Sequence, residues 1–178
     1  MTRLVLALAF FLQASTPGFD INAWDKVGDA NWRVVDGIVE ADKGVGFLVS
    51  KTPYGDFRMT TDFWVSDDAN SGVFIRASNP KEITAANSYE VNIFDKRPDQ
   101  TYRTGGIVNI AKPQNMTMMT GGKWNTIEIV AKGPKMTVTV NGTPMVDVEH
   151  RQFQRGPIAL QASAGTVRFR NVQITSLN

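Results

Sequence analysis

The chain has 178 residues, with 19 basic and 17 acidic side chains, a formal net charge of +2, no cysteine and one histidine. This length suits one domain with a sizeable core, and the lack of cysteine excludes disulfides, thiolate nucleophiles and Cys-ligated metals. One histidine excludes a multi-histidine zinc site, and because no basic run stands out we expect no nucleic-acid partner.

Residues 1–15 have the pattern of a secretory signal peptide. Arg3 supplies a positive start, Leu4 to Leu12 is an unbroken apolar run that is short for a membrane span, and small residues follow at Ala14 and Ser15. The alternative is a buried core segment. We expect a leader over residues 1–15 and a single domain over residues 19–178. The mature protein is then secreted or periplasmic, with no membrane partner after leader removal.

Strand patterns follow one another through the rest of the chain. Asp36-Gly37 predicts a tight hairpin, and no long stretch has helical spacing with caps around it. The expected strands are residues 32–35, 38–40, 56–65, 71–76, 88–95, 105–110, 125–131, 135–140, 157–162 and 167–175. Many short strands with regular turns predict an all-β fold, a two-sheet antiparallel β-sandwich.

Two neighbouring strands carry an unusual mixture of side chains. In residues 88–95, Tyr89, Val91 and Ile93 share one face, and Glu90 and Asn92 share the other. In residues 71–76, Phe74 and Arg76 alternate with Val73 and Ile75 in the same way. A face with a carboxylate, an amide, an arginine and an aromatic ring suits a polar ligand with many hydroxyl groups.

Other candidate residues lie on an earlier strand and in loops. Asp62 and Trp64 share the polar face of residues 56–65, and Tyr102 and Arg103 belong to a long irregular stretch of the kind that frames binding sites. His150 is either a member of the site or a structural histidine. Residues 67–70 contain oxygen ligands suited to a structural calcium ion but are more typical of a turn, so we expect no cofactor and no metal site.

A series of motifs in order along the chain resembles the 3-keto-disaccharide hydrolase domain family. The matching pieces are Trp32 to Gly37, Tyr54 to Phe57, Asn70 to Arg76, Ser88 to Ile93, Thr104-Gly105, Lys123 to Asn125, Asn141-Gly142, Arg155 to Gln161 and Val167 to Val172. The resemblance implies a jelly-roll sandwich of the concanavalin A-like lectin/glucanase type. It also implies activity on a carbohydrate, a glycoside oxidised at the 3-position.

Two departures from the family pattern concern the site. Family members commonly follow the late Leu-Gln pair with an acidic or amide residue, histidine and glycine, whereas Ala162 to Gly165 follow Leu160-Gln161 here. The position of Asn92 is often glutamine. Laminarinase-type glucanases have a similar fold and a Glu-x-Asp-x-x-Glu strand, to which Glu90, Asn92 and Asp95 correspond in spacing. We interpret this as a shared location on the concave sheet and not as shared chemistry.

Two reaction routes fit these candidates. A standard glycosidase needs two carboxyl groups, which Glu90 with Asp62 or Asp95 would supply, although Asp95 requires a bend in its strand. The resemblance implies a second route, in which Glu90 removes the acidic proton beside the 3-keto group and Arg76 stabilises the oxyanion. Asn92 would then orient a hydroxyl group, and Trp64 or Phe74 would stack on the sugar.

Two further interpretations compete with an exported hydrolase, lyase or hydratase acting on glycosides. One is a non-catalytic carbohydrate-binding module of lectin type, which tolerates the loss of Glu90. The other is a structural sandwich that meets another protein through the concave face. Separately, Arg76 and Glu90 could form only a cross-strand ion pair without a role in chemistry.

Overall fold

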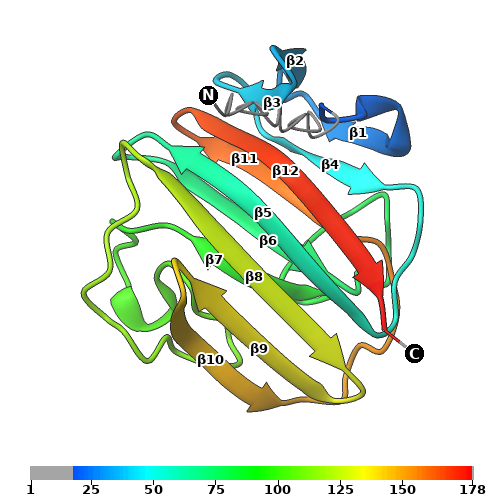
Figure 1. Cartoon of the computed structure of the whole chain (residues 1–178), viewed down its shortest axis with the longest axis vertical. Coiled ribbons are helices and arrows are strands. Elements are labelled where there is room, and N and C mark those ends of the chain that lie inside the picture. Colours follow the sequence, from blue (N-terminus) through cyan, green and yellow to red (C-terminus); the bar gives the residue numbers. More distant parts are fainter. Residues whose placement is uncertain (1–17, 178) are drawn as a thin grey trace, which may run out of the picture.

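The computed structural model describes residues 18–177, which form two antiparallel sheets packed face to face (Figure 1). The five-stranded sheet contains, in spatial order, β1 (Trp24–Gly28), β4 (Gly46–Ser50), β11 (Ala159–Ala164), β6 (Asn70–Ile75) and β7 (Tyr89–Ile93). The all-β sandwich predicted from the sequence is confirmed. The expected leader, residues 1–15, lies outside the described residues.

The second sheet has seven strands. They are, in spatial order, β10 (Thr143–Glu149), β9 (Lys135–Val140), β8 (Trp124–Lys132), β5 (Phe57–Val65), β12 (Val167–Ser176), β3 (Ile38–Ala41) and β2 (Arg33–Val35). The helices of residues 18–177 are two 3₁₀ turns, η1 (Ile21–Ala23) and η2 (Gln100–Tyr102), and neither has the length or apolar character needed to cross a bilayer.

The core lies between the sheets and is filled by the inward side chains of alternating strands. On β5, Phe57, Met59 and Phe63 are fully buried, and on β7 Tyr89 and Val91 are fully buried as well. Because successive side chains of a strand point to opposite faces, the intervening residues of β5 and β7 face outward. The two sheets therefore present two separate outer faces.

Two hairpins form where the sequence predicts tight turns. Asp36 and Gly37 between β2 and β3 have φ of 50° and 77°, and Asn141 and Gly142 between β9 and β10 have φ of 50° and 74°. Two successive positive φ values define the turn that best matches the twist of paired strands, and glycine and asparagine adopt them at low cost.

The strand expected over residues 105–110 is wrong. Gly105 has a φ of 84°, and the chain closes on itself through hydrogen bonds between Ile107 and Ala111. Only isolated pairing with β7 remains, in which the backbone of Asn92 bonds to Gly105 and Gly106. The segment therefore covers the edge of β7 without extending the sheet regularly.

Arg76 is turned away from the face predicted for it. Its φ of 53° interrupts the alternation at the end of β6, and its side chain is 1% exposed. The guanidinium donates to the carbonyl oxygens of Gly55 (3.0 Å) and Gly133 (2.7 Å) and pairs with Asp56 (3.1 Å). Gly55 and Gly133 adjoin strands of the seven-stranded sheet, so Arg76 fastens the two sheets together at one end of the sandwich.

We expect Arg76→Met to lower the free energy of unfolding by about 3 kcal/mol, because it removes the donor to two carbonyl oxygens and leaves Asp56 without its ion-pair partner. Urea denaturation of the two proteins at pH 7 measures the difference. Arg155→Met is the control, because Arg155 is exposed. Equal stability of the Arg76 and Arg155 variants would contradict this role.

Candidate functional site

Glu90 and Phe74 lie side by side on the outer face of the five-stranded sheet. The register places Phe74 of β6 opposite Glu90 of β7, and Ala159 of β11 opposite Phe74. In the next row, Asn92 lies opposite Gly72, which lies opposite Gln161. Two consecutive strands and one from near the end of the sequence thus build one surface.

An apolar patch forms the floor beside Glu90. Its buried members are Val49, Phe74, Ala77, Ile83 and Ala159, with Val27 and Phe47 packed against them. The rings of Phe47 and Phe74 meet edge to face, with centroids 5.2 Å apart. Apolar neighbours exclude water, and so the carboxyl group of Glu90 lies in a poorly solvated position.

The environment of Glu90 changes its acidity. Burial raises the pKa of Glu90 to about 7, against an ordinary value of 4.5, although the positive charge of Arg97 acts in the opposite direction. A carboxyl group with a pKa near neutrality both accepts and donates protons readily at physiological pH. Glu90 is therefore the described carboxyl group best suited to acid–base chemistry.

Asn92 anchors a loop. It is fully buried, and its amide nitrogen donates to the carbonyl oxygen of Tyr102 over 2.5 Å. Its amide oxygen is enclosed and has no hydrogen-bond partner among residues 18–177. Asn92 therefore shares the outer face of β7 with Glu90 but lies beneath the segment that contains the half-buried Tyr102.

Gln161 and Gly72 belong to this face and were missed as site residues. The side-chain oxygen of Gln161 is enclosed without a hydrogen-bond partner in the part of the chain that the structure describes. A Cβ added to Gly72 would lie 3.5 Å from that oxygen and 3.5 Å from the ring of Phe74, so the glycine keeps the space between them open. The sequence contains no signal for this arrangement, because it does not reveal that β11 pairs with β6.

Asp62 and Trp64 lie on the other outer face of the sandwich, so the expected pairing of Asp62 with Glu90 is wrong. Both carboxylates point outward, but from different sheets. Burial acts to raise the pKa of Asp62, yet hydrogen bonds from Thr126, Asn171 and Arg170 together hold it below its ordinary value. Asp62 is thus a stable carboxylate in a polar network.

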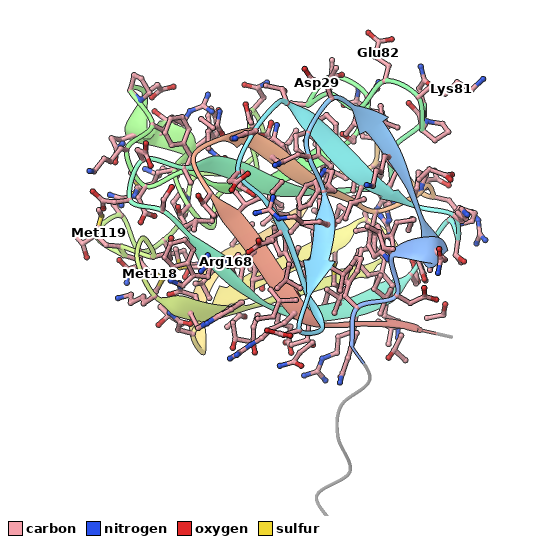
Figure 2. All side chains as sticks on the ribbon, turned by 90° about the horizontal axis from the view of Figure 1, so that it is seen from above. Asp29, Lys81, Glu82, Met118, Met119 and Arg168 are labelled. Carbon is pink, nitrogen blue, oxygen red and sulfur yellow. The ribbon has the colours of Figure 1, made fainter. Side chains whose placement is uncertain are left out.

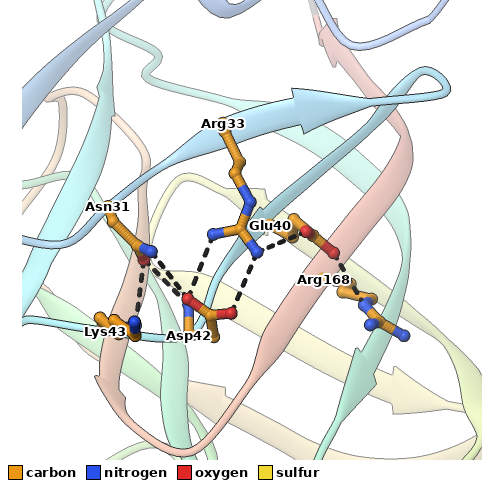
Figure 3. A network of polar contacts seen from close by, with 6 residues as sticks. All are labelled: Asn31, Arg33, Glu40, Asp42, Lys43 and Arg168. Carbon is orange, nitrogen blue, oxygen red and sulfur yellow. Dashed lines mark hydrogen bonds and ion pairs between the residues drawn. The ribbon is translucent and has the colours of Figure 1, made fainter.

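The charged side chains on that second outer face pair with one another. Arg168 lies over the ring of Trp64 at 4.7 Å from its centroid and donates to Glu40, which also pairs with Arg33 at 2.6 Å. Figure 3 shows how Arg33 bridges Glu40 and Asp42. Because Arg168 covers Trp64, the ring is not the open stacking surface expected for a sugar.

Asp95 and Arg103 hold loops in place and do not join Glu90. The buried carboxylate of Asp95 accepts hydrogen bonds from Thr104, Thr120 and Gly121. Arg103 donates to the carbonyl oxygens of Met116 and Met118. Figure 2 shows Met118 and Met119 at the edge of the molecule, far from Lys81 and Glu82.

His150 also lies away from Glu90. Its Nδ1 is 3.0 Å from the hydroxyl of Tyr89, whose side chain belongs to the core and accepts a bond from the Phe153 amide. The tyrosine hydroxyl therefore links the His150 ring to the backbone of Phe153. With Arg76, His150 lines a cavity of about 320 Å³ that does not include Glu90.

The acidic residues of the expected turn at 67–70 have partners of their own. Asp67 pairs with Lys96, and Asp68 accepts a hydrogen bond from Ser66. Among residues 18–177, no three His, Cys, Asp or Glu side chains gather in an arrangement able to hold a metal ion.

Comparison with protein families decides the relationship. Residues 13–175 match the model of the 3-keto-alpha-glucoside-1,2-lyase-like domain. The chain belongs to this family. Its membership confirms the resemblance of the motifs and supports a carbohydrate-active protein of a glycosyl hydrolase-like family. Curated protein sequences give no significant match.

Solved structures with a similar fold include enzymes and binding modules. A candidate glycosyl hydrolase from Parabacteroides distasonis has a TM-score of 0.79 and 18% identity, over 89% of this chain and 90% of that chain. A carbohydrate-binding module from Bacillus subtilis has a TM-score of 0.70 and 18% identity, over 86% and 96%. The β-glucanase of Bacillus licheniformis has a TM-score of 0.65 and 15% identity, over 90% and 95%. At these identities the likeness establishes the concanavalin A-like sandwich fold.

The raised pKa of Glu90 predicts a dependence of stability on pH. Between pH 4.5 and 7 the folded protein holds a proton that the unfolded chain releases, so stability falls as pH rises through this range. Glu90→Gln removes the ionisation, and we expect this variant to match the wild type near pH 4 and to exceed its stability at pH 8.5 by up to about 3 kcal/mol.

Urea denaturation across this pH range measures the effect. Glu149→Gln, which removes the same charge from an exposed position, is the control and should follow the wild type. A stability difference between Glu90→Gln and wild type that does not change with pH would show that burial leaves Glu90 unperturbed.

Proposed function

We propose that this protein cleaves glycosides whose sugar carries a ketone at C3, with Glu90 as the group that accepts the proton. The observation that carries the proposal is a half-buried carboxyl group with a pKa of about 7 beside the ring of Phe74. Membership of the 3-keto-alpha-glucoside-1,2-lyase-like family supports this substrate class.

The placement of the acidic residues favours elimination over a two-carboxylate mechanism. Asp62 faces outward from the other sheet, and the carboxylate of Asp95 already accepts hydrogen bonds from Thr104, Thr120 and Gly121. Neither provides the second carboxyl group that a standard glycosidase needs close to the first. A ketone makes the neighbouring C–H acidic, and so one base suffices.

The proposed reaction begins when the Glu90 carboxylate takes the proton from C2. The electron pair of the broken C–H bond forms a C2–C3 double bond, and the C3 oxygen becomes an enolate. When the C3 carbonyl reforms, the pair moves to a C1–C2 double bond, the C1–O bond breaks, and the departing oxygen takes a proton from Glu90 or water. Addition of water across the new double bond completes a net hydrolysis.

A carbohydrate-binding module is the second candidate. The edge-to-face pair of Phe47 and Phe74 on the outer face, and the similarity to a bacterial carbohydrate-binding module, favour it. On this alternative the protein binds the sugar without turning it over, and Glu90 is dispensable. One assay of binding and turnover on the same ligand separates the two functions.

We expect Glu90→Gln to lower kcat by roughly 10²-fold or more, with binding largely retained, because the amide keeps the shape but accepts no proton. The substrate is 4-nitrophenyl 3-keto-α-glucoside, and the rate at which it releases 4-nitrophenolate measures kcat. In the wild type, kcat should rise with pH around a midpoint near 7, because Glu90 must be ionised to act as the base.

Asp62→Asn is the matched control, because Asp62 lies on the opposite outer face. We expect its kcat to equal that of the wild type. Unchanged turnover in the Glu90 variant would place the base elsewhere, and binding without turnover by the wild type would favour the binding module.

We also propose that the protein is exported, on the pattern of residues 1–15. Mass spectrometry of the protein from its native host should find a mature N-terminus between about residues 15 and 19. Exported protein that retains Met1 would refute the proposal.

A further inference from the structure

The segment after β7 folds back over the outer face that carries Glu90. Arg97 donates its amide to the carbonyl of Phe94, and the side chain of Gln100 donates to the carbonyl of Arg97. η2 follows, and its last residue, Tyr102, accepts the hydrogen bond from the Asn92 side chain. The segment that contains Arg97 is therefore fastened to β7 two residues from Glu90.

Among residues 18–177, the half-buried side chain of Arg97 lacks the hydrogen-bond acceptors that the buried side chains of Arg76 and Arg103 have. Within residues 18–177, its Nε is enclosed without a hydrogen-bond partner, and its terminal nitrogens make no hydrogen bond or ion pair. The Nε of Arg103 is likewise enclosed without a partner among the described residues, but the terminal nitrogens of Arg103 and of Arg76 donate to backbone carbonyl oxygens. A desolvated donor without an acceptor destabilises a fold, so a retained one requires an explanation.

The positive charge of Arg97 lowers the pKa of Glu90 relative to the effect of burial alone. Among the described residues, it is the cationic group that opposes the effect of burial on the pKa of Glu90. The loop also brings the carbonyl oxygen of Tyr102 to this face, where the sheet contributes Gln161 and apolar side chains. Asp99, the nearby acid, is occupied in capping η2 through Thr101.

Resting on the proposed function, we infer that Arg97 is a catalytic residue that donates hydrogen bonds to the C3 oxygen of the substrate and stabilises its enolate. Proton removal by Glu90 sends the electron pair of the C–H bond toward this oxygen, and a guanidinium beside it stabilises the negative charge. When the carbonyl reforms, the charge leaves with the departing group, and Arg97 remains unchanged. After the proton transfer, Arg97 therefore stabilises an anionic enolate that lies next to a Glu90 carboxyl group that is now neutral.

Turnover of the 4-nitrophenyl 3-keto-α-glucoside by Arg97→Met, Arg97→Gln and Arg97→Lys tests the inference. We expect Met and Gln to lower kcat at least 10²-fold and Lys to recover part of the loss, because an ammonium group supplies charge without the planar fork. The pH midpoint of kcat should rise in Met and Gln and stay near that of the wild type in Lys. Arg155→Met is the control for a lost surface arginine.

Binding of ascorbate, a stable enolate, tests the same site without turnover. We expect calorimetry at pH 6 to show at least tenfold weaker binding in Arg97→Met and Arg97→Gln, and no weakening in Glu90→Gln. If ascorbate binding depends on Arg97 but no 3-keto-glycoside is turned over, the enolate site stands and the proposed reaction fails. Turnover within threefold of wild type in folded Arg97→Met, or ascorbate binding indifferent to Arg97, overturns the inference.

Discussion

The packing of β7 against the core is the constraint on which the rest of the site depends. Tyr89, Val91 and Ile93 are fully buried between the sheets, and the period of two in a strand then requires Glu90 and Asn92 to face outward. A shift of the register by one residue would put a carboxylate into the core and expose three large apolar side chains. The stability of the sandwich and the position of the candidate base therefore have the same origin.

The same face explains why Glu90 differs from an ordinary surface carboxylate. Most of its neighbours across β6, β11 and β4 are apolar, and Gly72 leaves a space next to Phe74 where another residue would place a side chain. Low solvation favours the neutral acid, while Arg97 favours the carboxylate. The balance between these two effects sets a pKa useful for proton transfer, and each effect belongs to a different element of the fold.

The remaining polar residues divide into structural groups with clear tasks. Arg76 joins the two sheets at one end, Asp95 ties β7 to two loops, and Arg103 holds the segment with the exposed methionines. On the seven-stranded sheet, Asp62 accepts a hydrogen bond from Arg170, and Arg168 lies over the ring of Trp64. Charge alone thus does not mark the site, whereas a titratable group in an apolar setting beside unpaired polar atoms does.

The sequence by itself determined the sandwich class, the hairpin at Asp36-Gly37 and the outward direction of Glu90 and Asn92, because alternation and turn residues are local properties of the chain. It failed at Arg76, where a left-handed backbone turns the side chain toward the core side, and at Asp62, whose strand joins the other sheet. Only the tertiary structure decided that Gln161 and Gly72 share the outer face with Glu90 and that the charge of Arg97 acts on Glu90, because strand order and loop paths depend on contacts between distant residues. Burial decided the acidity of Glu90 for the same reason, since the solvation of a side chain depends on what the whole fold places around it.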